Sequence, residues 1–211
     1  MSSVTVIDYG VGNLASVIKA MQFVGLQPHL TTDPQEAARA DRLILPGVGA
    51  FAAAMASLES GGFIPVLKDY CASGRPFLGI CLGMQLLLSE SHEMGSTKGL
   101  GIISGRVVRF YESAPESVPD GLKIPHMGWN TLDVTENPGV LPAVAQGASV
   151  YFVHSYYAVP DDTAVVAAYS THGERFAAAL SAGNVFATQF HPEKSGGVGL
   201  EILKCFGGIS V

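Results

Sequence analysis

Cys81 lies in a glycine-flanked turn that can present a thiol for nucleophilic attack. It is the middle residue of Gly79-Ile80-Cys81-Leu82-Gly83, between an apolar strand-like run, residues 77–80, and a helix-like run, residues 84–88. A nucleophile on a sharp strand-to-helix turn needs a strained backbone and neighbours without a Cβ atom, which glycine supplies. The start of a helix also lowers the pKa of a thiol. The pattern therefore predicts that Cys81 attacks a carbonyl carbon.

The alternative for Cys81 is a buried structural role, because free cysteine is among the most buried residue types. The pattern around this one residue does not decide between the two interpretations. Cys71 and Cys205 have no comparable glycine turn, and we expect both to be structural.

A general base with its own orienting carboxylate is indicated 110 positions later, in Phe190-His191-Pro192-Glu193. Proline biases the preceding residue toward extended geometry, and side chains two apart in an extended segment point to the same side. We therefore expect Glu193 to hold the imidazole of His191, which would take the thiol proton of Cys81. The order Cys, His, Glu is not that of a serine α/β-hydrolase, whose acid precedes the histidine. A surface turn or a zinc site are the alternatives, although the chain has no HExxH motif or Cys/His cluster.

Acyl-transfer chemistry also needs N–H donors for the developing oxyanion. The glycine turn Pro46-Gly47-Val48-Gly49 lies between a strand-like and a helix-like run and can offer such donors, and the N–H of Leu82 is a second candidate. On its own, this turn is as well explained as an ordinary strand-to-helix loop.

The elements that must position these residues form an α/β pattern in the first half of the chain. Short apolar runs at residues 4–7, 43–45 and 77–80 are each followed by helix-like stretches, at residues 13–24, 50–58 and 84–88. This alternation predicts parallel strands with crossover helices. Glycines at positions 61, 62 and 74 should break the helices.

The second half of the chain has a different residue pattern, with loops and short strand-like runs. Residues 91–101 and 111–121 are polar or rich in Gly and Pro, and we expect loops there. Strand-like runs follow with little helix between them, at residues 106–110, 150–153, 164–169, 177–180 and 185–188, before a closing helix at 199–206. An antiparallel or mixed extension of the sheet is expected.

Composition sets limits on function. The chain has 211 residues, 48% of them hydrophobic, and can bury a core as a single domain. A net charge of −6 leaves no broad basic face for nucleic acid. Three cysteines outside any CxxC spacing favour a reducing, cytoplasmic compartment, and neither a signal peptide nor a membrane-spanning apolar run is expected.

Together the cysteine turn and His191-Pro192-Glu193 resemble the two signatures of the triad-type, or class I, glutamine amidotransferases. The resemblance covers nearly the whole chain and is least diagnostic at residues 111–121. It implies an open, mostly parallel, flavodoxin-like sheet flanked by helices in one amidotransferase domain, residues 1–211. It also implies hydrolysis of glutamine through a thioester on Cys81, without cofactor or metal, and release of ammonia to a synthase partner.

Further segments look like those of family members that serve histidine biosynthesis, whose partner is a (β/α)₈-barrel cyclase subunit. They are residues 8–13, 46–49, 125–130 and 151–156, together with Lys194. The resemblance implies a heterodimer and assigns roles to single positions. Val48 and Leu82 would be oxyanion donors, the glutamine site would be lined by Gly49, Gln85, Ser155 and Tyr156, and the partner would contact Asn13, Trp129, Tyr151 and Lys194.

Control of the glutaminase is expected in the oxyanion turn. Val48 lies between two glycines, so its peptide can turn at modest cost. Our hypothesis is that the free chain holds the Val48 N–H turned away from the site. Binding at the partner's site would then shift the population toward the conformation that is competent for catalysis.

Other interpretations stay open from the sequence. The chain could be a glutaminase for pyridoxal phosphate or anthranilate synthesis, or an inactive scaffold. A dinucleotide-binding module would use residues 10–15, which fit G-x-G-x-x-A, with Asp33 on the ribose.

His126 and His154 have apolar neighbours and are expected to be packed, hydrogen-bonded histidines, not bases. His29, His92 and His172 are expected at the surface.

Overall fold

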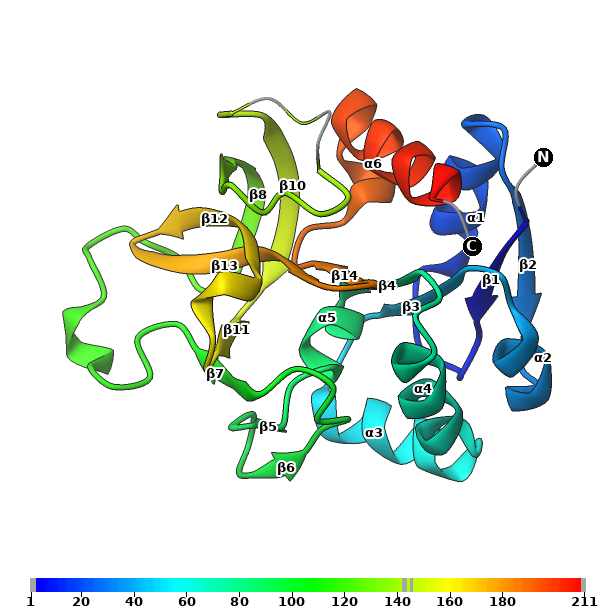
Figure 1. The fold of residues 1–211 in the computed structure, drawn as a ribbon. Coiled ribbons are helices and arrows are strands. Elements are labelled where there is room, and N and C mark those ends of the chain that lie inside the picture. The colour runs from blue at the N-terminus through cyan, green and yellow to red at the C-terminus, as the bar shows by residue number, and fades with distance from the viewer. Residues whose placement is uncertain (1–2, 142–143, 145, 210–211) are drawn as a thin grey trace.

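The computed structural model describes residues 3–141, 144 and 146–209. In this part of the chain an eight-stranded sheet runs through the centre, in the order β2-β1-β3-β4-β14-β13-β12-β9 (Figure 1). Its strands are β1 (Ser3–Ile7), β2 (Gln27–Thr31), β3 (Leu43–Gly47), β4 (Phe77–Cys81), β9 (Asp133–Val134), β12 (Val166–His172), β13 (Glu174–Ala182) and β14 (Val185–Thr188).

The sheet is parallel from β2 to β14 and antiparallel from β14 to β9. Every residue of β3, β4 and β14 is buried, as expected for parallel strands that are covered on both faces. The predicted mostly parallel α/β sheet with an antiparallel C-terminal extension is therefore confirmed. The predicted strand at 164–169 begins two residues late, because Thr163–Val165 forms a 3₁₀ turn, η2.

Helices cover both faces of the parallel part. Figure 1 shows α1 (Leu14–Phe23) and α6 (Gly196–Gly208) on one face, and α3 (Phe51–Ser60), α4 (Phe63–Ala72) and α5 (Leu82–Leu86) on the other. The glycine breaks are where the sequence predicted them: Gly61 ends α3, and Gly62, with φ of 71°, precedes α4. Within the described residues no helix is long and apolar enough to cross a bilayer.

Two smaller sheets lie beside the antiparallel end of the main sheet (Figure 1). One pairs β8 (His126–Thr131) with β10 (Ser149–His154). The other has the order β11-β7-β5-β6, and its strands are β5 (Glu90–Ser91), β6 (Thr97–Lys98), β7 (Gly105–Arg109) and β11 (Tyr156–Pro160). The prediction of loop throughout 91–101 is thus wrong where β5 and β6 pair. Residues 111–121 do form a loop, with one 3₁₀ turn, η1 (Pro115–Ser117).

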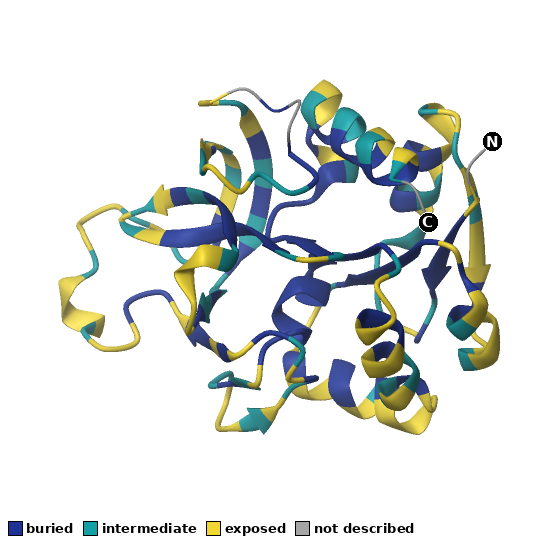
Figure 2. Cartoon of the chain, in the orientation of Figure 1, coloured by how far each residue is buried: buried dark blue, intermediate teal, exposed yellow. Residues whose placement is uncertain are grey.

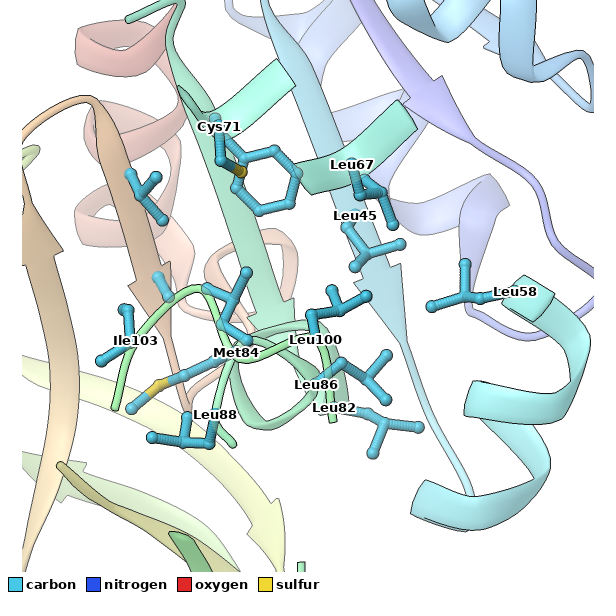
Figure 3. Packing of buried hydrophobic residues seen from close by; sticks show 14 of the residues in the cluster. Leu45, Leu58, Leu67, Cys71, Leu82, Met84, Leu86, Leu88, Leu100 and Ile103 are labelled. Carbon is cyan, nitrogen blue, oxygen red and sulfur yellow. The ribbon is translucent and has the colours of Figure 1, made fainter. Parts of the chain in front are cut away.

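The apolar core fills both sides of the main sheet. Figure 2 shows the central strands and α5 buried, while α3 and α4 expose their outer faces. All five residues of α5 are buried. Figure 3 shows how the helix is held, with Leu82, Met84 and Leu86 among Leu45, Leu58 and Leu100. The element that follows Cys81 is therefore fixed by close packing.

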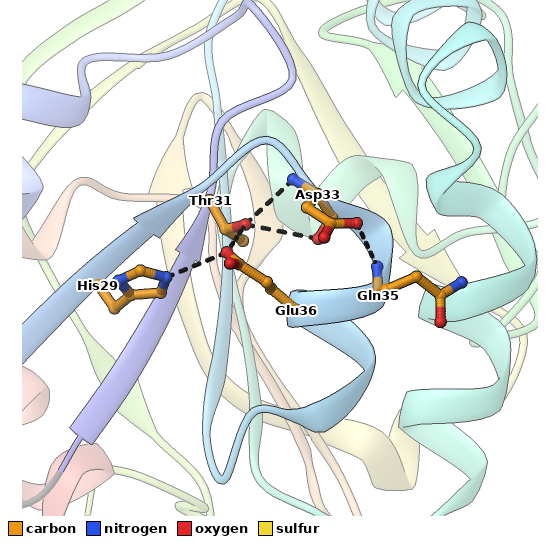
Figure 4. Close-up of polar contacts among 5 residues, drawn as sticks. All are labelled: His29, Thr31, Asp33, Gln35 and Glu36. Atoms are coloured by element: carbon orange, nitrogen blue, oxygen red, sulfur yellow. Dashed lines mark hydrogen bonds and ion pairs between the residues drawn. The ribbon is translucent and has the colours of Figure 1, made fainter.

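A polar cluster at the start of α2 (Pro34–Arg39) accounts for Asp33 (Figure 4). The Gln35 N–H donates to the Asp33 carboxylate at 2.8 Å, which caps the helix. The Thr31 hydroxyl accepts from the Asp33 N–H at 3.0 Å and donates to Glu36 at 2.5 Å. The carboxylate that a dinucleotide-binding module would use for a ribose is therefore committed to capping α2.

Candidate active site

Cys81 ends β4 and directly precedes α5, with φ of 54° and ψ of −107°. This is the strained backbone that the sequence predicted for a nucleophile turn. A Cβ atom on Gly79 would lie 2.8 Å from the carbonyl oxygen of Gly83, and one on Gly83 would overlap the carbonyl oxygen of Leu45. The flanking glycines thus let α5 approach β3 and β4 closely enough to form the turn.

His191 and Glu193 form a buried pair beside this turn. Nδ1 of His191 lies 2.8 Å from Oε1 of Glu193, and the two side chains are only 2% and 1% exposed. The contact was predicted correctly, but the extended segment invoked for it was wrong. His191 itself is extended, whereas Pro192–Lys194 forms a single 3₁₀ turn, η3, which brings the carboxylate back to the ring.

A cavity of about 420 Å³ opens at Cys81. His191 lines it, and its Nε2 has no hydrogen-bond partner among the described residues. This nitrogen is therefore free to exchange a proton with sulfur or substrate. All six residues assigned to the oxyanion and glutamine sites also line the cavity, namely Val48, Gly49, Leu82, Gln85, Ser155 and Tyr156.

Comparison with known proteins places this geometry in a family. The family model for "Glutamine amidotransferase class-I" matches residues 5–206. The chain belongs to the class I glutamine amidotransferases.

Curated relatives in this family match over almost their whole length. The chain is 51% identical to "Imidazole glycerol phosphate synthase subunit HisH" of Geobacter sulfurreducens, over 98% of this chain and 99% of the relative. It is 48% identical to the protein of the same name in Methanothermobacter thermautotrophicus, over 96% of each. Among solved structures, PurLQS from Thermotoga maritima superposes with a TM-score of 0.72 at 18% identity, over 98% of both chains, which shows a shared fold.

The surroundings of His191 favour its charged form. Burial of the ring lowers the pKa, but the interactions with Cys81 and Glu193 outweigh burial and raise the pKa of His191 to about 9. At neutral pH the histidine therefore carries a proton, which suits an imidazolium facing a thiolate.

Two polar residues of the site were missed from the sequence. Glu93 lines the cavity, and its carboxylate accepts the Phe51 N–H at 2.6 Å. Gln189 is fully buried, and its side-chain nitrogen lies 3.8 Å from the sulfur of Cys81. Gln189 could have been found from the sequence, because it is a polar residue at the end of an apolar strand. A polar side chain buried at such a place needs hydrogen-bond partners.

Three of the four residues predicted to face a partner form one cluster. The rings of Trp129 and Tyr151 are 6.1 Å apart, and Nζ of Lys194 lies 5.9 Å from the centre of the Tyr151 ring. Trp129 is 58% exposed. Asn13 lines a small gap together with Val48 and Glu193.

His126 and His154 are packed histidines, as predicted. Nδ1 of His126 lies 3.1 Å from Nε2 of His154, whose Nδ1 lies 2.9 Å from the carbonyl oxygen of Tyr156. Burial lowers the pKa of His126 to about 4 and that of His154 to about 3. Cys71 is also buried, which raises the pKa of its thiol to about 12 and leaves it unreactive.

Proposed function

We propose that the protein is the glutaminase subunit of imidazole glycerol phosphate synthase and that Cys81, His191 and Glu193 are its catalytic triad. The observation that carries the proposal is the strained Cys81 turn, open to a cavity that His191 lines with a free Nε2. Relatives with that subunit name, at 51% and 48% identity over nearly full length, support the choice within the family.

The triad would hydrolyse the side-chain amide of glutamine in two steps. The Cys81 thiolate attacks the amide carbon, and protonated His191 gives its proton to the departing ammonia, which leaves a γ-glutamyl thioester. His191 then takes a proton from water, and the hydroxide attacks the thioester to release glutamate. The N–H groups of Val48 and Leu82, which both line the cavity, would hold the oxyanion in each step.

The cavity has a suitable size and lining for the substrate. Gly49, Gln85, Ser155 and Tyr156 would surround the glutamine side chain and backbone. Glu93 supplies a carboxylate on the cavity wall, and a carboxylate suits the substrate's α-ammonium group. This pairing would tell free glutamine from a glutamine residue within a peptide, which has no free amino group.

The partner would be a (β/α)₈-barrel cyclase subunit in a heterodimer. Asn13, Trp129, Tyr151 and Lys194 would face it, and the exposed Trp129 offers an aromatic anchor of the kind enriched at interfaces. Ammonia would pass to the partner, which acts as a lyase and forms imidazole glycerol phosphate and AICAR in histidine biosynthesis. Cys71, Cys81 and Cys205 are all free thiols, which suits the reducing cytoplasm.

Ammonia release from glutamine tests the proposal, with and without the cyclase and its ribonucleotide substrate. We expect strong activation by the partner and no release by Cys81→Ala, with Cys205→Ala as the matched control. If the chain instead supplied ammonia to a different synthase, of the pyridoxal phosphate or anthranilate type, and that synthase formed its product, the assignment within the family would be overturned. Full activity of Cys81→Ala would overturn the triad.

A further inference from the structure

Gln189 is a buried amide directly beside the nucleophile. It follows β14, which pairs in parallel with β4 so that Thr188 lies opposite Ile80, and this register brings the next residues, Gln189 and Cys81, together. Nε2 of Gln189 lies 3.8 Å from the Cys81 sulfur, within hydrogen-bonding distance for that atom. Its main chain is held as well, because the Gln189 N–H donates to the carbonyl oxygen of Ala178 at 2.8 Å.

The orientation of the Gln189 amide follows from its neighbours. Nε2 of Gln85 donates to Oε1 of Gln189 at 3.0 Å and to the carbonyl oxygen of Tyr156 at 2.8 Å. A side-chain amide has two N–H donors, so these two acceptors use both donors of Gln85. Because Oε1 of Gln189 accepts from Gln85, its donor end must face Cys81.

The Tyr156 carbonyl that orients Gln85 is itself held in place. It also lies 2.9 Å from Nδ1 of His154, and burial keeps this histidine neutral, so Nδ1 can donate while Nε2 faces His126. A chain of hydrogen bonds thus runs from His154 through Tyr156, Gln85 and Gln189 to the sulfur. A donor held in this way needs no reorganisation when negative charge appears on sulfur.

We propose that the Gln189 amide donates a hydrogen bond to the Cys81 thiolate and raises the thiolate fraction, and that Gln85 is the positioning residue that aims it. The proposal rests on the proposed role of Cys81 as the nucleophile. In the first step the donor stabilises the thiolate before attack. In the second step it stabilises the same thiolate as the thioester carbon–sulfur bond breaks. Gln189 and the N-terminus of α5 would thus stabilise charge on the sulfur, while the N–H groups of Val48 and Leu82 would stabilise charge on the oxyanion.

The test is the pH dependence of Cys81 alkylation by iodoacetamide in the full chain, followed at Cys81 by mass spectrometry. Gln189→Met removes the donor, and Gln189→Glu keeps the shape and the acceptor for Gln85 but puts a carboxylate oxygen where the donor was. We expect the apparent thiol pKa to rise by about one unit in Gln189→Met and by more in Gln189→Glu. The rate of Cys81 alkylation at pH 7 should be about tenfold lower in Gln189→Met than in the wild type.

Two further variants separate positioning from general destabilisation. Gln85→Met leaves the Gln189 amide free to turn, so we expect a pKa shift in the same direction that is smaller than in Gln189→Met. Gln146→Met is the matched control, because Gln146 also uses both ends of its amide, with Asp133 and Val134, but lies at the surface. It should leave the Cys81 profile unchanged.

An unchanged alkylation profile in folded Gln189→Glu would overturn the proposal, with folding checked by thermal unfolding. If Gln189→Met fails to fold, the isosteric Gln189→Glu decides alone. Because alkylation needs no glutamine, this result is independent of the proposed function, whose failure would appear as ammonia release by Cys81→Ala.

Discussion

Replacing Glu193 by glutamine tests how this carboxylate sets the charge of His191. The carboxylate lies 2.8 Å from Nδ1 of His191, and neither side chain is more than 2% exposed. For charges about 4 Å apart at an effective dielectric constant of 20, the attraction is about 4 kcal/mol, or about three pKa units. Removal of this charge should therefore lower the pKa of His191 from about 9 by up to about three units, while the interaction with Cys81 remains.

The consequence is that most His191 loses its proton at pH 8. Glutaminase kcat/KM in the partner complex should fall by about 10² to 10⁴, the range for losing a general acid–base group or its orienting carboxylate. The assay is ammonia release across pH 6 to 10, together with NMR titration of His191. Glu201→Gln is the control, since that carboxylate is about half exposed on α6, 3.9 Å from Nζ of Lys204.

Stability gives a second readout with a defined sign. The pKa of His191 is higher in the folded state than its ordinary value of 6.5, so the pair stabilises the fold fully below pH 6.5 and loses this effect as pH rises through about 9. The difference in unfolding free energy between wild type and Glu193→Gln should therefore shrink as pH rises from about 6.5 to about 9. Two results would refute the reasoning: a difference independent of pH, or an unchanged His191 titration in the variant.

Three other perturbations have expected outcomes. Gly83→Ala should abolish ammonia release, because the new Cβ overlaps the Leu45 carbonyl oxygen, and activity at the wild-type level with the partner would contradict the packing of the turn. Gly49→Ala, at φ of 92°, should change the ratio of partner-activated to basal activity, and an unaltered ratio would count against control through the neighbouring Val48 peptide. Urea unfolding should show that stability decreases as the pH is lowered from 6 to 4.5. Burial holds the pKa of His154 at about 3 in the folded protein, so in this range the histidine binds a proton only in the unfolded chain. His154→Gln should reduce that slope by about 1 kcal/mol per pH unit, and an equal slope in both proteins would argue against a neutral buried histidine.

Tertiary contacts decided several elements that the local pattern could not. The strands β2 and β8 have short or interrupted apolar runs, and they form because β1 and β10 pair with them. The helix α4 was not predicted either, and it packs against α2 and α3. Such pairing depends on partners far away in the chain, which a local reading of apolar periodicity does not contain.

The sequence alone predicted the glycine turn at Cys81 and the contact between His191 and Glu193, because the glycine and proline preferences that favour them are local. Gly79 and Gly83 permit the turn at Cys81, and Pro192 keeps His191 extended. Tertiary structure alone decided the rest of the site. Glu93 reaches the cavity through the β5 region, and Gln189 meets Cys81, 108 positions away, because β14 inserts beside β4. Contacts of that kind follow from strand order in the sheet, which local residue patterns leave undetermined.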